Sequence, residues 1–199
     1  MGILGVDNCG NICHHGNIRG EVYFMNRLVD ILKKQEGFSE KPYWDNKQWS
    51  IGYGTNLEMF PPEEQERYKA EGIAEDVAAV ELTRRAMEAQ ETLRRHLPDV
   101  YPKLNRARQV ALESMVYNLG TQGFLGFTNT LRALRRGDFE GAALGMLDSK
   151  AARVDAPGRY QELAEMMRTG QYPSWYQKDI RKGVQEKVRR AMRMKKEKM

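Results

Sequence analysis

Apolar residues recur at helical spacing along most of the chain. The longest stripe steps by four, three, four and four residues through Leu82, Ala86, Ala89, Leu93 and Leu97. These positions share one helix face, so the pattern predicts a helix over 74–96, about 35 Å long at about 1.5 Å per residue. Similar stripes, with prolines, glycines and capping residues at their ends, predict further helices over 22–35, 61–72, 105–119, 128–135, 138–147 and 157–168.

One short segment breaks this helical pattern. Residues 41–44 and 48–53 are aromatic and alternating, which is typical of strands, and Asn46-Lys47 suits a tight turn between them. Gly52 and Gly54 mark places where the backbone bends or something approaches closely. A small antiparallel sheet among many helices predicts an α+β fold. The length of 199 residues suits one domain, or one domain built as two lobes.

The candidate chemistry lies where the first helix meets this sheet. Glu36 ends the helix before Gly37, Asp45 follows at a strand end or turn, and Ser50 lies on the next strand. Glycoside hydrolysis needs two carboxyl groups in one cleft, one protonated to serve the leaving oxygen and one ionised to activate water. Two ordinary surface acids beside a turn would give the same pattern.

Three blocks of sequence decide between these alternatives. They are Glu36-Gly37-Phe38 with Tyr43-Trp44-Asp45 and 50–54; 111–120 with 126–131; and Pro157-Gly158-Arg159 with 168–170. In this order and spacing they resemble the phage lysozyme family, the muramidases of the T-even phage type, over roughly residues 25–177. The resemblance implies a two-lobed fold, with a small β-hairpin lobe and a larger helical lobe joined by the long helix over 74–96.

The resemblance also implies roles for the residues at the junction. It makes Glu36 the general acid, and Asp45 the group that activates water or stabilises the cationic transition state. Ser50 stands where the family usually has Thr, and either hydroxyl can hold the water. Arg159 matches an arginine that pairs near the acid and would fix its rotamer. The spacing from Asp45 to Ser50 is one residue shorter than usual, which could move Asp45 slightly.

A second set of matches implies a sugar-binding cleft. Asn56 on the β lobe, and Tyr117, Asn118 and Thr130 on the helical lobe, match positions that line it. From the residues alone, Tyr117 would equally be core and Thr130 a helix cap. Gly145 stands where some members have a sugar-contacting Asn, which bears on fine specificity more than on the reaction.

The charge is unevenly distributed along the chain. Residues 178–199 hold ten Lys or Arg and three Asp or Glu, a net of +7, whereas the remainder has a net of −2. The nearly neutral body argues against a nucleic-acid binder. In the tail, apolar residues recur every four positions among the basic ones. This predicts a basic amphipathic helix, with anionic membrane, lipopolysaccharide, a protein groove or only solvent as its partner.

The N-terminal range 1–24 is glycine-rich and precedes the family match, so we interpret it as an added arm. The predicted layout is therefore an arm over 1–24, a catalytic domain over 25–177 and a basic helix over 178–199, with phage tail proteins as candidate partners of either addition. Cys9 and Cys13 are the only cysteines, and with His14 and His15 they lack the common zinc spacings. We expect no metal and no cofactor, because two carboxyl groups suffice for acid–base chemistry.

The expected function is hydrolysis of the β-1,4 bond between N-acetylmuramic acid and N-acetylglucosamine in peptidoglycan. We see neither a signal peptide nor an apolar run of about 20 residues. The protein is therefore expected to be made in the host cytoplasm and to act on the wall in the periplasm, free or on a virion. The alternatives are a lytic transglycosylase, which needs no water-positioning Asp, and a tail component that carries a lysozyme module.

Overall fold

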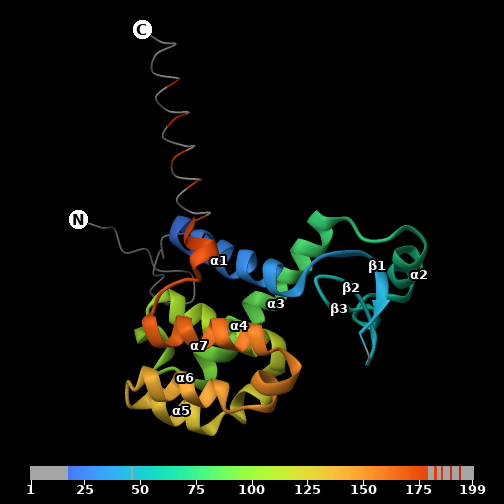
Figure 1. Ribbon diagram of the computed structural model, residues 1–199. Coiled ribbons are helices and arrows are strands. Elements are labelled where there is room, and N and C mark those ends of the chain that lie inside the picture. The colour runs from blue at the N-terminus through green and yellow to red at the C-terminus, as the bar shows by residue number, and fades with distance from the viewer. Residues whose placement is uncertain are drawn as a thin grey trace, which may run out of the picture.

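The computed structural model describes residues 18–45 and 47–178, together with residues 182, 185, 189 and 193. These residues form helices and one three-stranded antiparallel sheet, which confirms the predicted α+β class. Figure 1 shows the sheet at one end of the long helix α3 (Glu75–His96) and the helices α4 to α7 at its other end. This is the expected two-lobed arrangement.

The first helix, α1 (Ile18–Glu36), begins four residues before the predicted start at 22 and ends at Glu36 as predicted. Its start therefore falls inside the range 1–24 that the sequence suggested as an arm. The rest of that range, residues 1–17, lies outside the described residues, as do Asn46 of the expected turn and the apolar stripe of the basic tail.

The β lobe is a meander with one more strand than predicted. β1 (Ser39–Trp44) pairs with β2 (Trp49–Gly52), and β2 pairs with β3 (Thr55–Asn56). The register sets Tyr43 opposite Ser50 and Trp44 opposite Trp49. A 3₁₀ turn (Leu57–Met59) follows, and α2 (Pro62–Glu71) then packs on β1 and ends before Gly72. Proline at the helix start and glycine after its end make these the boundaries that the sequence indicated.

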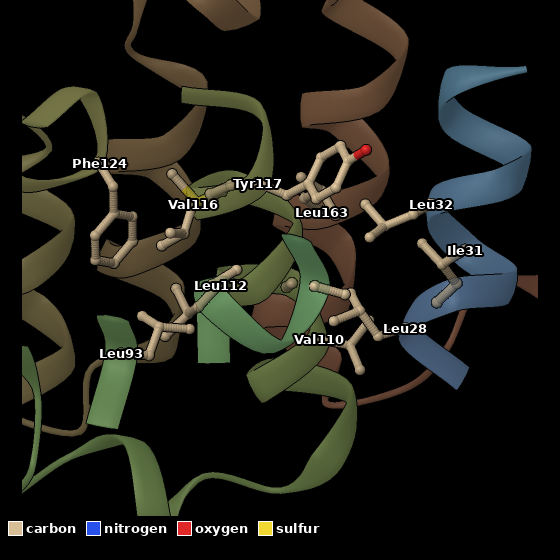
Figure 2. Packing of buried hydrophobic residues seen from close by; sticks show 14 of the residues in the cluster. Leu28, Ile31, Leu32, Leu93, Val110, Leu112, Val116, Tyr117, Phe124 and Leu163 are labelled. Carbon is tan, nitrogen blue, oxygen red and sulfur yellow. The ribbon is translucent and has the colours of Figure 1, made fainter. Parts of the chain in front are cut away.

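The helical lobe contains the main core. After a 3₁₀ turn (Tyr101–Lys103) come α4 (Arg106–Leu125), α5 (Thr128–Arg135), α6 (Phe139–Leu147), a π-helical turn (Ala151–Asp155) and α7 (Pro157–Thr169). The predicted stripe of α3 is buried. Figure 2 shows Leu28, Ile31 and Leu32 of α1 facing Val110 of α4 and Leu163 of α7. Because α1 packs on this core, its last residue is carried to the junction of the lobes.

Two details of the helix ends bear on the site. Asp138 caps α6 as predicted, since its Oδ1 accepts a 2.7 Å hydrogen bond from the amide of Gly141. By contrast, α5 begins at Thr128 after Phe127, and no side chain caps it. Within the described ranges, no helix is long and apolar enough to cross a bilayer.

Candidate active site

Glu36 lies at the C-terminal end of α1, where Gly37 terminates the helix with a φ of 68°. Its side chain is 16% exposed, and its Oε1 lies 3.0 Å from Nη1 of Arg159 at the start of α7. No donor in the described part of the chain makes a hydrogen bond to that oxygen, so the contact with Arg159 is an ion pair. Arg159 of α7 is thus the ion-pair partner of Glu36 in the structure.

The end of α1 is held by two other helices as well. Arg159 Nη2 donates to the backbone carbonyl of Gln35 at 3.0 Å, and so satisfies a carbonyl that the helix end leaves open. Ser114 of α4 is fully buried and donates to Oε1 of Gln35 at 2.6 Å. No local pattern in the sequence indicates this contact, because Gln35 and Ser114 are 79 positions apart. The Glu36 carboxylate is thus fixed from α1, α4 and α7 together.

Asp45 directly follows β1, and its side chain accepts hydrogen bonds from residues that come next in the chain. Oδ1 accepts hydrogen bonds from the amides of Lys47 at 3.1 Å and Gln48 at 3.0 Å. Oδ2 accepts a 2.7 Å hydrogen bond from the hydroxyl of Ser50, which is fully buried in β2. The shortened spacing between Asp45 and Ser50 therefore still lets the two side chains meet.

These bonds set the charge state of Asp45. The hydrogen bond from Ser50 lowers the pKa of the Asp45 carboxyl, and the amides of Gln48 and Lys47 lower it further. Donors that point at a carboxylate favour its ionised form. Asp45 is therefore held as an anion, which is the state required of a group that activates water.

Tyr43 links the two acids. Burial raises the pKa of the Tyr43 hydroxyl, and the charges of Asp45 and Glu36 raise it further, so this phenol lies within the field of both carboxylates. A Cβ added at Gly54 would lie 3.6 Å from Oε2 of Glu36 and 3.9 Å from the Tyr43 hydroxyl oxygen. Glu36 and Tyr43 therefore both lie close to the backbone at Gly54.

The predicted sugar-contacting residues do not all reach a surface. Asn118 is exposed, and Asn56 is half-buried with its Oδ1 accepting from the amide of Glu58 at 3.0 Å. Tyr117 is 9% exposed and donates to the carbonyl of Tyr53 at 3.3 Å. Thr130 is fully buried, and its hydroxyl lies 3.4 Å from the carbonyl of Ala142. Thr130 therefore lies beneath α6, with no exposed surface of its own.

A pocket of about 320 Å³ lies next to the buried Thr130, between α5 and α6. Thr128, Asn129, Gly145 and Ser149 are among its lining residues. A Cβ at Gly145 would meet Oγ1 of Thr130 at 2.7 Å, so the glycine allows the two helices to approach closely. The neighbours of Thr130 in sequence, rather than Thr130 itself, therefore face this opening.

Among the described residues, no three His, Cys, Asp or Glu side chains gather as a metal site. Cys9, Cys13, His14 and His15 lie outside the described residues. What the site does hold is a carboxyl group ion-paired at a helix end and a hydrogen-bonded carboxylate on a β-hairpin.

A two-lobed α+β fold with one carboxyl group at the end of α1 and a hydrogen-bonded carboxylate on the β-hairpin has the two kinds of group that acid–base glycosidases use. Comparison with known proteins makes this specific. The sequence model of the family "Phage lysozyme" matches residues 33–158, a range that contains Glu36, Asp45, Ser50 and Tyr117. The chain belongs to the phage lysozyme family, whose kind of activity is hydrolysis of peptidoglycan.

The chain is also similar to the pre-baseplate central spike protein Gp5 of Enterobacteria phage T4. The two are 26% identical over 205 aligned residues, which cover 87% of this chain and 36% of Gp5. The chain thus spans about a third of the length of that curated relative.

Proposed function

We propose that the protein is a muramidase that hydrolyses the β-1,4 bond between N-acetylmuramic acid and N-acetylglucosamine in peptidoglycan. The observation that carries this proposal is the contrast between its two carboxyl groups. Asp45 accepts three hydrogen bonds that hold it ionised, whereas the largely buried Glu36 carboxyl has the Arg159 guanidinium beside it, and its Oε1 accepts no hydrogen bond from the described residues. Environments that differ in this way divide the roles of base and acid.

In this mechanism Glu36 gives its proton to the oxygen that leaves with the broken glycosidic bond. A water molecule attacks the anomeric carbon from the other face, and its proton passes to Asp45. Because Ser50 and the amides of Lys47 and Gln48 fix both oxygens of Asp45, the base needs little reorganisation when water arrives. Ser50 is fully buried, so we assign it the positioning of Asp45 and not a direct contact with sugar.

For substrate contacts we propose Asn118 and Asn56, together with the residues that line the pocket between α5 and α6. Tyr117 is better placed to support the cleft from beneath, since its hydroxyl bonds to the backbone of the β lobe. Thr130 supports the pocket through its packing against Gly145.

The rival reaction is that of a lytic transglycosylase, which ends in an anhydro sugar because no water attacks. The hydrogen-bonded Asp45 favours hydrolysis, since a transglycosylase has no need of an activated water. A lytic transglycosylase should remain active without Asp45, so a variant at Asp45 distinguishes transglycosylation from hydrolysis.

We further propose that the enzyme works as a wall-penetrating module of a phage particle. The support for this proposal is the similarity of the chain to Gp5, which is a spike protein. The matched region makes up 36% of the length of Gp5. The catalytic domain would span 25–177. The ranges 1–24 and 178–199 would contact tail proteins or, for the basic range, anionic membrane or lipopolysaccharide surfaces. Peptidoglycan in the periplasm is the substrate, and nucleic acid is not a partner.

Turbidity clearing of outer-membrane-stripped cells tests the proposed activity. The wild-type protein should clear the suspension, and Glu36→Gln and Asp45→Asn should each lose nearly all of this activity while remaining folded. Glu91→Gln, which alters only an exposed pair with Arg95, is the matched control and should clear like wild type. A folded wild type that leaves turbidity unchanged would contradict the proposal and favour a purely structural tail component.

A further inference from the structure

Arg85 of α3 touches both lobes of the molecule. Its guanidinium carbon lies 4.3 Å from the centre of the Tyr117 ring on α4, and its Nη1 lies 3.5 Å from the carbonyl of Gly54 in the β lobe. Tyr117 in turn donates to the carbonyl of Tyr53 at 3.3 Å. The turn formed by Tyr53 and Gly54 therefore receives one donor from each of two helices.

The neighbouring Arg84 shows that this orientation is particular to Arg85. Arg84 forms ion pairs with Glu81 and Glu88 on the exposed side of α3. Arg85 is half-buried, and within the described part of the chain no carboxylate lies within 4.0 Å of its guanidinium. A cation that is partly removed from water and stacked on a phenol is held by the ring face in place of an acid.

Tyr117 is well suited to be the other half of this contact. Burial raises the pKa of its phenol, so the hydroxyl stays protonated and can donate to Tyr53. Arg85 and Tyr117 both line a pocket of about 180 Å³ between α3 and α4, which Gly120 and Thr121 help to enclose. The stacked pair thus forms one wall of an opening at the junction of the lobes.

The turn at Tyr53 and Gly54, which Arg85 and Tyr117 hold, lies directly against Glu36. Gly54 has a φ of 73°, and a Cβ added there would lie 3.6 Å from Oε2 of Glu36. Glu36 is therefore fixed on one side by Arg159 and bounded on the other by the backbone of this turn. A shift of the turn would change both the rotamer of Glu36 and the entry of water beside it.

We propose that Arg85 is a positioning residue for the glycosidase reaction. Stacked on Tyr117, it fixes the turn at Tyr53 and Gly54 and so keeps the Glu36 carboxyl in its productive place. In this role Arg85 acts through the turn and makes no contact of its own with the reacting atoms. The inference rests on the proposed function, because it assigns to Glu36 the role of general acid.

The test compares Arg85→Met, Tyr117→Phe and the control Arg84→Met in the full chain. The readouts are kcat and KM on purified peptidoglycan, amide hydrogen exchange of residues 50–57, and the thermal midpoint. We expect Arg85→Met to lower kcat about tenfold, since small displacements of a reacting group are costly, with KM changed by less than about twofold. Exchange at the turn should rise, whereas Arg84→Met should keep wild-type kcat and exchange.

A double-variant cycle separates coupling from independent damage. If Arg85 and Tyr117 act through the same turn, the combined variant should lose less than the product of the two single losses. Fully multiplicative losses, an unchanged kcat in Arg85→Met, or a fall in kcat without faster exchange at 50–57 would each overturn the proposal. Should Arg85→Met fail to fold, Arg85→Lys, which keeps the charge but lacks the planar guanidinium, carries the same readouts.

The same experiment distinguishes a failure of the proposed glycosidase function from a failure of the positioning role of Arg85. A wild-type protein that does not act on peptidoglycan would contradict the proposed function. The exchange measurements would still report whether Arg85 holds the turn, and unchanged exchange in Arg85→Met would contradict the inference in that case as well.

Discussion

The Ser50 hydroxyl donates to Asp45 Oδ2 at 2.7 Å across the β1–β2 hairpin. This bond joins the residue that we propose as the base to a side chain with no exposed surface. Ser50 lies opposite Tyr43 in the strand register, and the Tyr43 phenol lies in the field of both carboxylates. The sheet therefore presents the proposed base, while α1 presents the proposed acid.

Replacement of Ser50 by Ala should shift the acidic limb of the pH–rate profile. The Ser50 hydrogen bond lowers the pKa of Asp45, so its removal raises that pKa toward the ordinary value. Because Asp45 works as an anion, activity is lost as the pH falls through its pKa, and the limb should move to higher pH in Ser50→Ala. Ser50→Thr should keep the wild-type limb. An identical limb in all three proteins, measured as kcat/KM against pH, would contradict the role of this bond.

Removal of Arg159 should destabilise the fold through Glu36. Both side chains are largely buried, at 12% and 16% exposed, so Arg159→Met leaves an uncompensated carboxylate and should lower the free energy of unfolding by about 2 kcal/mol. Glu36→Gln in the same background should restore part of this loss, since no charge then remains. Urea denaturation measures both values. Arg153→Met, which removes an exposed pair with Asp148, is the control and should change stability by less than about 0.5 kcal/mol. Equal effects of Arg159→Met and Arg153→Met would speak against the buried pair.

Gly52 should tolerate no side chain. It has a φ of 64°, and an added Cβ would lie 2.9 Å from Cβ of Ala78 on α3. Gly52→Ala therefore combines backbone strain with a clash and should cost about 3 kcal/mol of stability. Gly137 has a φ of 71° with nothing within 4 Å, so Gly137→Ala isolates the strain and should cost about 1 kcal/mol. Equal losses of stability in Gly52→Ala and Gly137→Ala, measured by thermal denaturation, would contradict the close contact between Gly52 of β2 and Ala78 of α3.

Glu113 should matter to stability and not to catalysis. It is fully buried in α4, where Arg106 Nη2 lies 2.8 Å from its Oε2 and the Tyr101 hydroxyl also donates to it. Glu113→Gln removes the carboxylate that balances Arg106 and should destabilise the protein by about 3 kcal/mol. The kcat of the folded fraction should be unchanged at low temperature. A Glu113→Gln variant with wild-type stability and a lowered kcat would contradict this prediction, because it would show that Glu113 contributes to catalysis.

Much of the fold could be predicted because helical stripes are local signals. The stripe of α3 is buried as expected, and Gly37, Gly72 and Asp138 end or begin helices where the sequence placed them. The strand β3 could not be predicted from the sequence, because a strand of two residues is too short to show alternation. The π-helical turn over 151–155 likewise leaves no periodic trace.

The residues of the site also fall into those that a local motif indicates and those that only the packing reveals. Glu36, Asp45, Ser50 and Arg159 could be found because each belongs to a short motif, and the structure brings Glu36 to Arg159 and Asp45 to Ser50. The contacts of Gln35 with Ser114 and of Arg85 with Tyr117 depend on how helices cross, which no local pattern encodes. The burial of Thr130 under α6 is likewise a property of packing that the local sequence does not show.

The most direct test of the proposed reaction is the mass of the muropeptides that the wild-type protein releases from purified sacculi. Hydrolysis with Glu36 as acid and Asp45 as base predicts fragments that end in reducing N-acetylmuramic acid, and nearly none from Glu36→Gln or Asp45→Asn. Fragments that end in 1,6-anhydro-N-acetylmuramic acid, released equally well by Asp45→Asn, would contradict hydrolysis and identify a transglycosylase.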